Sequence, residues 1–291
     1  MRDELRICKR RKKCYNPLQK GIIGRKCMSS VSEIFAKRKV FIAFIVYGYP
    51  NIEASERLIE VMAQEGVDLI EIGIPFSDPT AEGKIIAGAN EVALKNGINT
   101  DKIFESLARI RHKLIGKKCA VNLAFMTYAN IVFSYGKERF IAQMRDLNIN
   151  ALILPDVPFE EKGAFESECV KNGVDLISFV APTSAESPDR FAQIVREAQG
   201  FIYCVSSLGV TGMRESVGGG VREMVSAIKQ IRSSIPVAVG FGISSAQQAR
   251  EIAEFADAII IGSAIVKLCG EKDCIQKVGA FVKEVRKALD S

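Results

Sequence analysis

Glu71 is the side chain with the clearest capacity for chemistry, because it interrupts an apolar run, residues 68–73, that is predicted to form a β-strand. Alternation along a strand places Glu71 on the face opposite Ile70 and Ile72. A carboxyl group in apolar surroundings has a raised pKa and can donate and accept protons near neutral pH. We interpret Glu71 as a catalytic acid and base. The alternative is a carboxylate paired with a buried cation, and no inward Lys or Arg is evident on the neighbouring predicted strands.

The segment 75–84, directly after this strand, is rich in residues that form turns and carries two more acids, Asp78 and Glu82. A loop of this kind can close over an active site and supply a second carboxylate. The alternative is a solvated surface loop. The residues of the segment leave both interpretations open.

Three glycine-bearing segments follow later predicted strands: 206–212, 240–244 and Gly262-Ser263. Backbone N–H groups at such glycines, together with the dipole of a helix that begins near Ser263, can hold an anion. Each glycine alone could belong to an ordinary turn. The three segments together predict a phosphate site, and therefore a substrate that ends in a phosphate monoester.

Aromatic side chains lie at or near the ends of the predicted strands, and they could form an apolar pocket beside Glu71. Packing in the core is the alternative, and it is stronger for Phe201 than for an aromatic residue between two loop glycines. The candidate pocket residues, all taken as substrate-binding candidates, are Phe44, Tyr128, Tyr203 and Phe241.

Eight short apolar runs alternate with amphipathic segments along the chain. Nearly continuous apolar runs are typical of strands buried on both faces of a parallel sheet. The predicted strands are residues 40–47, 68–73, 119–126, 150–155, 174–180, 200–206, 235–240 and 257–262. The predicted helices include residues 53–64, 137–147, 189–198, 221–232 and 246–254. The longest connection, 74–118, has room for an extra loop and helix.

This alternation predicts an α/β fold, a (β/α)8 TIM barrel with a parallel eight-stranded core, formed as a single domain by residues 28–291. No GxGxxG motif follows the first strand, which argues against a dinucleotide-binding fold. Barrel active sites lie at the carboxyl ends of the strands, and phosphate sites cluster after strands seven and eight. The barrel therefore brings Glu71 and the glycine segments to the same end.

The positive net charge of +6 resides at the amino terminus. Residues 1–27 hold ten of the 40 Lys and Arg residues but only two of the 34 Asp and Glu residues. We predict a disordered basic extension, or a start assigned too early relative to Met28; the alternative is a patch for RNA or an anionic surface, carried by the run Cys8–Cys14. The remainder is nearly neutral, so no nucleic-acid partner is expected.

The sequence also bears on metal binding, membrane association and the cellular compartment of the protein. No apolar run approaches the roughly 18 residues of a membrane span, so no membrane association is expected. The eight cysteines show no zinc spacing and His112 is the one histidine, so we expect no metal. Dispersed cysteines in apolar segments indicate a reducing cytoplasm.

Six motifs together resemble the alpha chain of tryptophan synthase over about residues 28–290. The first of them is highly specific, whereas the glycine motifs alone fit many phosphate-binding barrels. The motifs are Glu71–Pro79 (EIGIPFSDP), Tyr128–Asn130 (YAN), Pro155–Pro158 (PDVP), Leu208–Gly212 (LGVTG), Gly240–Ser244 (GFGIS) and Ile261–Val266 (IGSAIV).

The resemblance implies a lyase that cleaves indole-3-glycerol phosphate by a retro-aldol reaction to indole and glyceraldehyde 3-phosphate. Indole then passes through a tunnel to a beta chain that carries PLP, usually in an αββα complex. No cofactor is implied for this chain itself. Glu71 would carry the proton to C3 of the indole, and Thr211 would help to hold the loop after the second strand closed. The implied phosphate-binding residues are Gly212, Gly242, Gly262 and Ser263, and the implied indole contacts are Phe44, Tyr203 and Phe241.

The chain departs from the family pattern at several positions near this site. The family carries a second catalytic Asp, which accepts the indole N–H, in a pattern Asp-Pro-x-Ala-Asp-Gly; this chain has Glu82 there. One extra methylene moves a carboxylate by about 1 Å, and such a shift can cost about 100-fold in rate. The other departures are Tyr49 for Asp, Lys84 for Pro, Ala87 for Gln and Ser207 for Arg.

These departures leave two hypotheses. In the first, the chain is a working lyase with Glu71 and Glu82 as its catalytic residues. In the second, it is a weak or inactive alpha-like subunit that binds the phosphate ligand and allosterically activates the beta chain.

Overall fold

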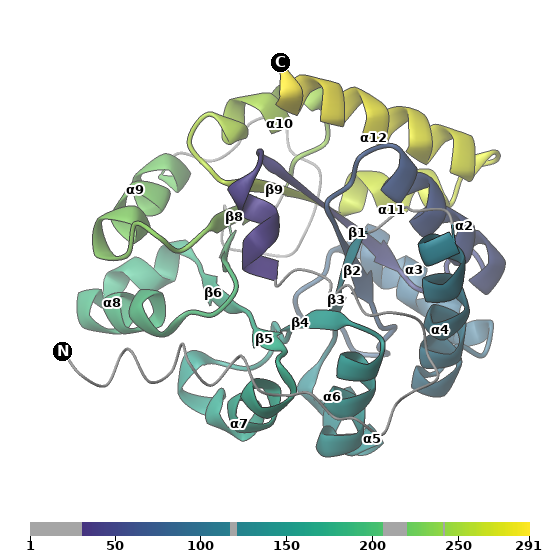
Figure 1. Cartoon of the computed structure of the whole chain (residues 1–291), viewed down its shortest axis with the longest axis horizontal. Helices are drawn as coiled ribbons and strands as arrows, with labels where there is room; N and C mark the ends of the chain where they lie inside the picture. The colour runs from purple at the N-terminus through teal and green to yellow at the C-terminus, as the bar shows by residue number, and fades with distance from the viewer. Residues whose placement is uncertain (1–30, 117–120, 206–219, 241) are drawn as a thin grey trace.

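Parallel strands form the centre of the molecule in the computed structural model, which describes residues 31–116, 121–205, 220–240 and 242–291 (Figure 1). The strands are hydrogen-bonded in the order β5-β4-β3-β2-β1-β9-β8-β7-β6, and each assigned pair is parallel. Their bounds are β1 Val40–Val46, β2 Leu69–Gly73, β3 Asn122–Met126, β4 Ile149–Ile153, β5 Asp175–Leu176, β6 Ser178–Val180, β7 Ile202–Val205, β8 Val237–Gly240 and β9 Ala258–Ile261.

The strands β5 and β6 lie at the two ends of this order but are separated in the chain by Ile177 alone. The predicted single strand 174–180 is thus divided in two. Its first part pairs with β4, through Leu152 and Leu176, and its second part pairs with β7, through Phe179 and Tyr203. Closing a sheet into a barrel staggers the strands, which explains why one strand meets its two neighbours at different heights. The predicted parallel barrel is confirmed.

Helices surround the strands on the outside of the barrel (Figure 1). Both α3 and α4 lie in the long connection that was predicted to hold an extra helix, and the other predicted helices agree with the structure to within a residue at each end. The bounds are α2 Ile52–Gln64, α3 Lys84–Lys95, α4 Thr100–Gly116, α5 Ala129–Tyr135, α6 Lys137–Asp146, α7 Gly163–Asn172, α8 Pro188–Glu197, α9 Val221–Ile231, α10 Ala246–Ala253, α11 Ser263–Cys269 and α12 Cys274–Asp290. Short 3-10 helices are η1 Val31–Ala36, η2 Phe159–Glu161 and η3 Pro182–Glu186.

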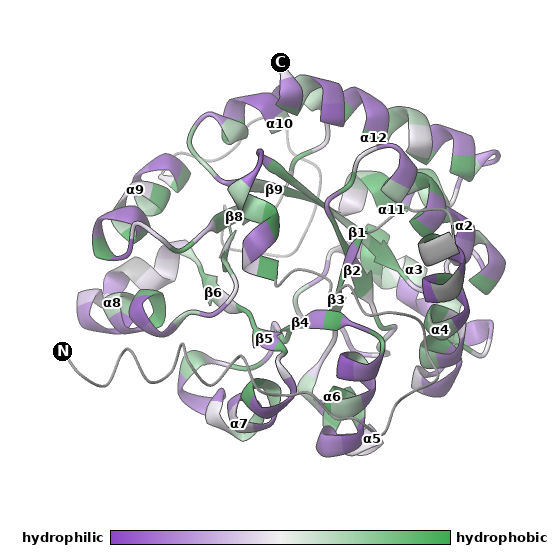
Figure 2. Cartoon of the chain, viewed as in Figure 1, coloured by the Kyte–Doolittle hydropathy of each residue, from purple (hydrophilic) through white to green (hydrophobic). Residues whose placement is uncertain are grey.

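Local sequence explains where these helices begin and which face they bury. The side chain of Asn51 accepts a hydrogen bond from the backbone N–H of Ala54 and caps α2. In α8 the buried residues Phe191, Ile194 and Val195 follow helical spacing, so one stripe of the helix faces the barrel. Hydrophobic colour accordingly concentrates on the strands, whereas the outer helices carry hydrophilic faces (Figure 2).

Charge pairs connect the elements at the amino-terminal end of the barrel. Asp68, just before β2, accepts hydrogen bonds from Arg38 at 2.7 Å and Arg286 at 3.1 Å, and also from the backbone N–H of Phe41. Arg286 is buried, and its guanidinium also bonds Asp290. Barrel enzymes place stabilising contacts at this end and chemistry at the other.

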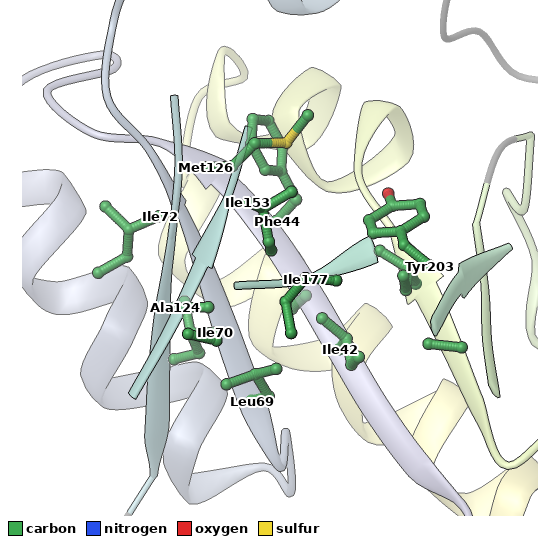
Figure 3. Close-up of a cluster of buried hydrophobic side chains, with 14 of the residues drawn as sticks. Ile42, Phe44, Leu69, Ile70, Ile72, Ala124, Met126, Ile153, Ile177 and Tyr203 are labelled. Atoms are coloured by element: carbon green, nitrogen blue, oxygen red, sulfur yellow. The ribbon is translucent and has the colours of Figure 1, made fainter. Parts of the chain in front are cut away.

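The interior of the barrel is apolar along most of its length. Figure 3 shows Leu69 and Ile42 at one end of the buried cluster, and Phe44, Met126 and the hydroxyl of Tyr203 toward the other. That second group belongs to the carboxyl ends of the strands. No helix in the described residues is long and apolar enough to cross a membrane.

Candidate active site

A cavity of about 230 Å³ lies at the carboxyl ends of the strands, where the barrel fold predicts the site. Its walls come from the ends of the strands and from the loops that follow them, so residues distant in the sequence meet there. The lining residues are Phe44, Glu71, Ala81, Glu82, Ile86, Met126, Pro155, Phe179, Ala181, Tyr203, Val205, Gly242, Ile243, Ile260, Gly262 and Ser263.

Glu71 is 1% exposed and faces this cavity, as the alternation along its strand predicts. Neither of its carboxyl oxygens has a hydrogen-bond partner in the part of the chain that the structure describes. Burial raises the pKa of Glu71 to about 8. Glu71 is therefore a neutral acid at pH 7. The alternative was a carboxylate neutralised by a buried cation, and no Lys or Arg among the described residues forms a salt bridge with Glu71.

Glu82 reaches the same cavity from the loop between β2 and α3, and it is 9% exposed. The hydroxyl of Tyr128 donates a hydrogen bond to its carboxylate. Burial raises the pKa of Glu82, and the nearby charge of Asp156 adds to this, whereas the bond from Tyr128 acts in the opposite direction. At Glu82 the loop is part of the cavity wall rather than a solvated surface, while Asp78 on the same loop is exposed.

The predicted phosphate residues are only partly covered by the structure. Gly242, Gly262 and Ser263 all line the cavity. Gly242 has a φ of +84°, a backbone conformation that side chains other than glycine disfavour. Ser263 begins α11 directly after β9, so backbone N–H groups at this turn are free of partners inside the helix. Thr211, Gly212 and Phe241 lie outside the described residues.

The predicted aromatic residues divide into two groups. Phe44 and Tyr203 line the cavity, whereas Tyr128 is buried outside the lining and contacts the loop that carries Glu82. Phe179 was not singled out from the sequence, yet it lines the cavity with its ring centroid 5.0 Å from that of Tyr203. Phe179 lies near the end of the predicted strand 174–180, and this position could have identified it from the sequence as a pocket candidate. The apolar walls suit a flat aromatic group.

The described residues contain no group of three or more His, Cys, Asp or Glu side chains placed to hold a metal ion. The chemically active side chains in the cavity are the two carboxyl groups of Glu71 and Glu82 and the hydroxyls of Tyr203 and Ser263. Such a set can move protons at a bound substrate.

The fold and the cavity define a (β/α)-barrel protein with a candidate acid–base site at the carboxyl ends of its strands. The sequence model of the tryptophan synthase alpha chain family matches residues 32–290. The tryptophan synthase alpha chain of Lacticaseibacillus casei is 38% identical over 266 residues, which span 91% of this chain and 97% of that protein. That of Methanocaldococcus jannaschii is 44% identical over 230 residues, 79% of each chain.

Solved structures agree with the sequence comparison. A chain of Mycobacterium tuberculosis tryptophan synthase superposes with a TM-score of 0.80 at 31% identity, covering 90% of this chain and 98% of that one. Tryptophan synthase subunit alpha from Campylobacter jejuni superposes with a TM-score of 0.75 at 35% identity, covering 86% and 97%. The chain belongs to the tryptophan synthase alpha chain family, which confirms the resemblance carried by its motifs.

Proposed function

We propose that the chain is a lyase of tryptophan biosynthesis that cleaves indole-3-glycerol phosphate into indole and glyceraldehyde 3-phosphate. Membership of the family supports this reaction. The single observation that carries it is the state of Glu71, a buried carboxyl group without a partner among the described residues, in the wall of an apolar cavity. A regulatory subunit without chemistry has no use for such an acid, which costs stability whenever it ionises.

The cavity suggests how the substrate lies. The phosphate end would lie at Gly242, Gly262 and Ser263, on the loops after β8 and β9. The indole ring would lie between Phe44 and Tyr203, against apolar walls that exclude water. This orientation places C3 of the indole and the adjoining hydroxyl-bearing carbon toward Glu71 and the ring N–H toward Glu82.

The reaction then needs one group to move two protons. Neutral Glu71 donates its proton to C3, and positive character develops on the ring nitrogen, whose N–H donates a hydrogen bond to the Glu82 carboxylate. The bond between C3 and the glycerol chain breaks, and its electron pair returns to the ring. The hydroxyl on the departing carbon loses its proton to the Glu71 carboxylate as the aldehyde forms. Glu71 ends in its starting form, because its pKa of about 8 suits both transfers near neutral pH.

We further propose that the chain works in the cytoplasm with a beta chain in an αββα complex. The PLP of that complex would be held by the beta chain, and indole would pass to it. The similarity to solved tryptophan synthase chains supports this assignment.

Steady-state cleavage of indole-3-glycerol phosphate, by residues 28–291 alone and with a beta chain, tests the proposal. We expect cleavage that the partner stimulates. Absence of cleavage under both conditions, together with faster formation of tryptophan from serine and indole by the beta chain, would instead establish the regulatory alternative.

A further inference from the structure

Tyr128 holds the loop between β2 and α3 at both of its ends. The residue follows β3, precedes the first turn of α5 and is 3% exposed. Its ring stacks on that of Phe76 near the start of the loop, with centroids 4.7 Å apart and planes at 26°. Its hydroxyl accepts a hydrogen bond of 3.1 Å from the backbone N–H of Ala81 and donates one to Glu82, near the end of the loop.

This set of contacts fixes the direction of the Glu82 side chain. A glutamate has one more rotatable bond than an aspartate, so its carboxylate needs an additional contact to occupy one position. The hydroxyl of Tyr128 contacts the carboxylate through Oε2. The backbone N–H groups of Ala81 and Glu82 also donate hydrogen bonds to this carboxylate. Because a carboxylate can accept about four hydrogen bonds, it can still accept one from a substrate.

We propose that Tyr128 is a positioning residue for the reaction, which holds the Glu82 carboxylate in place to accept the indole N–H. This inference rests on the proposed lyase function. Tyr128 does not line the cavity, so it acts through Glu82 and not through contact with substrate. In our proposal this positioning role replaces the prediction from the sequence that Tyr128 contacts the substrate.

The bond also favours the charged form of Glu82, which is the form that stabilises a positive ring nitrogen. The titratable groups near Glu82 are Tyr128, Asp156 and Tyr203, with Glu71 in the same cavity wall. Of these, Asp156 and burial disfavour ionisation of Glu82, while the Tyr128 hydroxyl favours it. Lys84, the nearest cation in sequence, is exposed at the start of α3, and none of the salt bridges among the described residues joins it to Glu82. Loss of the Tyr128 hydroxyl therefore raises the pKa of Glu82.

The test is the Tyr128→Phe variant, which keeps the ring on Phe76 and removes the hydroxyl. We expect kcat for cleavage to fall by about 10- to 100-fold, as for a misplaced catalytic group, with a much smaller change in KM. We also expect the acidic limb of the pH–rate profile to move to higher pH. In a double-mutant cycle, Tyr128→Phe should add nothing to the loss caused by Glu82→Gln.

Tyr135→Phe is the matched control. Tyr135 is the last residue of α5, the helix that Tyr128 directly precedes, and its hydroxyl donates a 2.6 Å hydrogen bond to Asp101, outside the cavity. Its removal should leave kcat and the pH profile unchanged. Binding of glyceraldehyde 3-phosphate by the Tyr128→Phe protein shows whether the variant is folded.

The outcomes separate the two proposals. A wild-type chain that does not cleave the substrate, alone or with a beta chain, overturns the proposed function. A wild-type chain that cleaves, with a Tyr128→Phe variant of equal kcat and equal acidic limb, overturns the positioning role alone. A loss that adds fully to that of Glu82→Gln would also overturn it, because Tyr128 would then act independently of Glu82.

Discussion

Phe44 on β1 and Glu71 on β2 are register partners, and both side chains reach the cavity at the carboxyl ends of these strands. The two residues are thus neighbours in the wall of the cavity, where Glu71 is 1% exposed. Because no described side chain compensates for the lost hydration, the pKa of Glu71 rises to about 8. Burial in apolar surroundings, to which Phe44 contributes, gives the acid a pKa that is useful near neutral pH.

The activity should depend on pH in a bell-shaped manner. Glu71 must be protonated to donate, so kcat/KM should fall above about pH 8. Glu82 must be ionised to accept, so kcat/KM should also fall at low pH, with a midpoint above the ordinary 4.5 because burial raises the pKa of Glu82. Rates measured in buffers of constant ionic strength test this. A profile that is flat from pH 6 to pH 9 would contradict the assignment of Glu71.

The raised pKa of Glu71 should also make the free energy of unfolding depend on pH. The folded-state pKa of Glu71 lies above its unfolded value of 4.5, so the folded state holds the proton in the interval between them and stability falls as pH rises. In Glu71→Gln this contribution is absent. The difference in the free energy of unfolding, variant minus wild type, should grow by about 4 kcal/mol between about pH 5 and pH 8. Urea denaturation at a series of pH values measures it, and a constant difference would show that Glu71 titrates normally.

Shortening Glu82 to aspartate should reduce the activity, although aspartate is the residue of the family pattern. The structure places the Glu82 carboxylate against the hydroxyl of Tyr128, and a side chain one methylene shorter withdraws from it by about 1 Å. We expect kcat to fall by about 10- to 100-fold in Glu82→Asp. A rise in kcat would show instead that the glutamate marks a weakened site.

Gly73, at the end of β2, leaves room for the ring of Phe44. A Cβ atom at this position would lie 2.7 Å from Cζ of Phe44 and 3.1 Å from the carbonyl oxygen of Ile45. Gly73→Ala should therefore displace the ring, lower kcat/KM and destabilise the fold by about 1–3 kcal/mol.

Gly88→Ala is the matched control, since a Cβ at Gly88 in α3 meets no atom within 4 Å. This variant should be stabilised by about 0.5–1 kcal/mol with unchanged kinetics. Thermal unfolding and steady-state cleavage of both variants make the comparison. Equal behaviour of the two would refute the packing role of Gly73.

The sequence predicted those features that depend on local alternation and on the ends of strands. The orientation of Glu71 follows from the two-residue period of a strand, and the convergence of Phe44, Gly242 and Ser263 follows from the geometry of a parallel barrel. Both are as expected in the structure.

Other features depend on tertiary contacts that no local pattern encodes. The hydrogen bond between Tyr128 and Glu82 joins residues 46 positions apart, and its existence depends on how two loops approach. The division of the strand 174–180 around Ile177 results from the stagger of the closed barrel. The place of Phe179 in the cavity wall depends in turn on that stagger, through its register with Tyr203.

The Glu71→Gln variant tests the central claim most directly, because it preserves the shape of the side chain and removes its acid. Cleavage of indole-3-glycerol phosphate and binding of glyceraldehyde 3-phosphate should be measured on the same preparation, with and without a beta chain. We expect the rate of cleavage to fall by at least about 100-fold and the dissociation constant of glyceraldehyde 3-phosphate to remain unchanged. A variant that cleaves at the wild-type rate would contradict the role of Glu71 as the acid and base of the reaction.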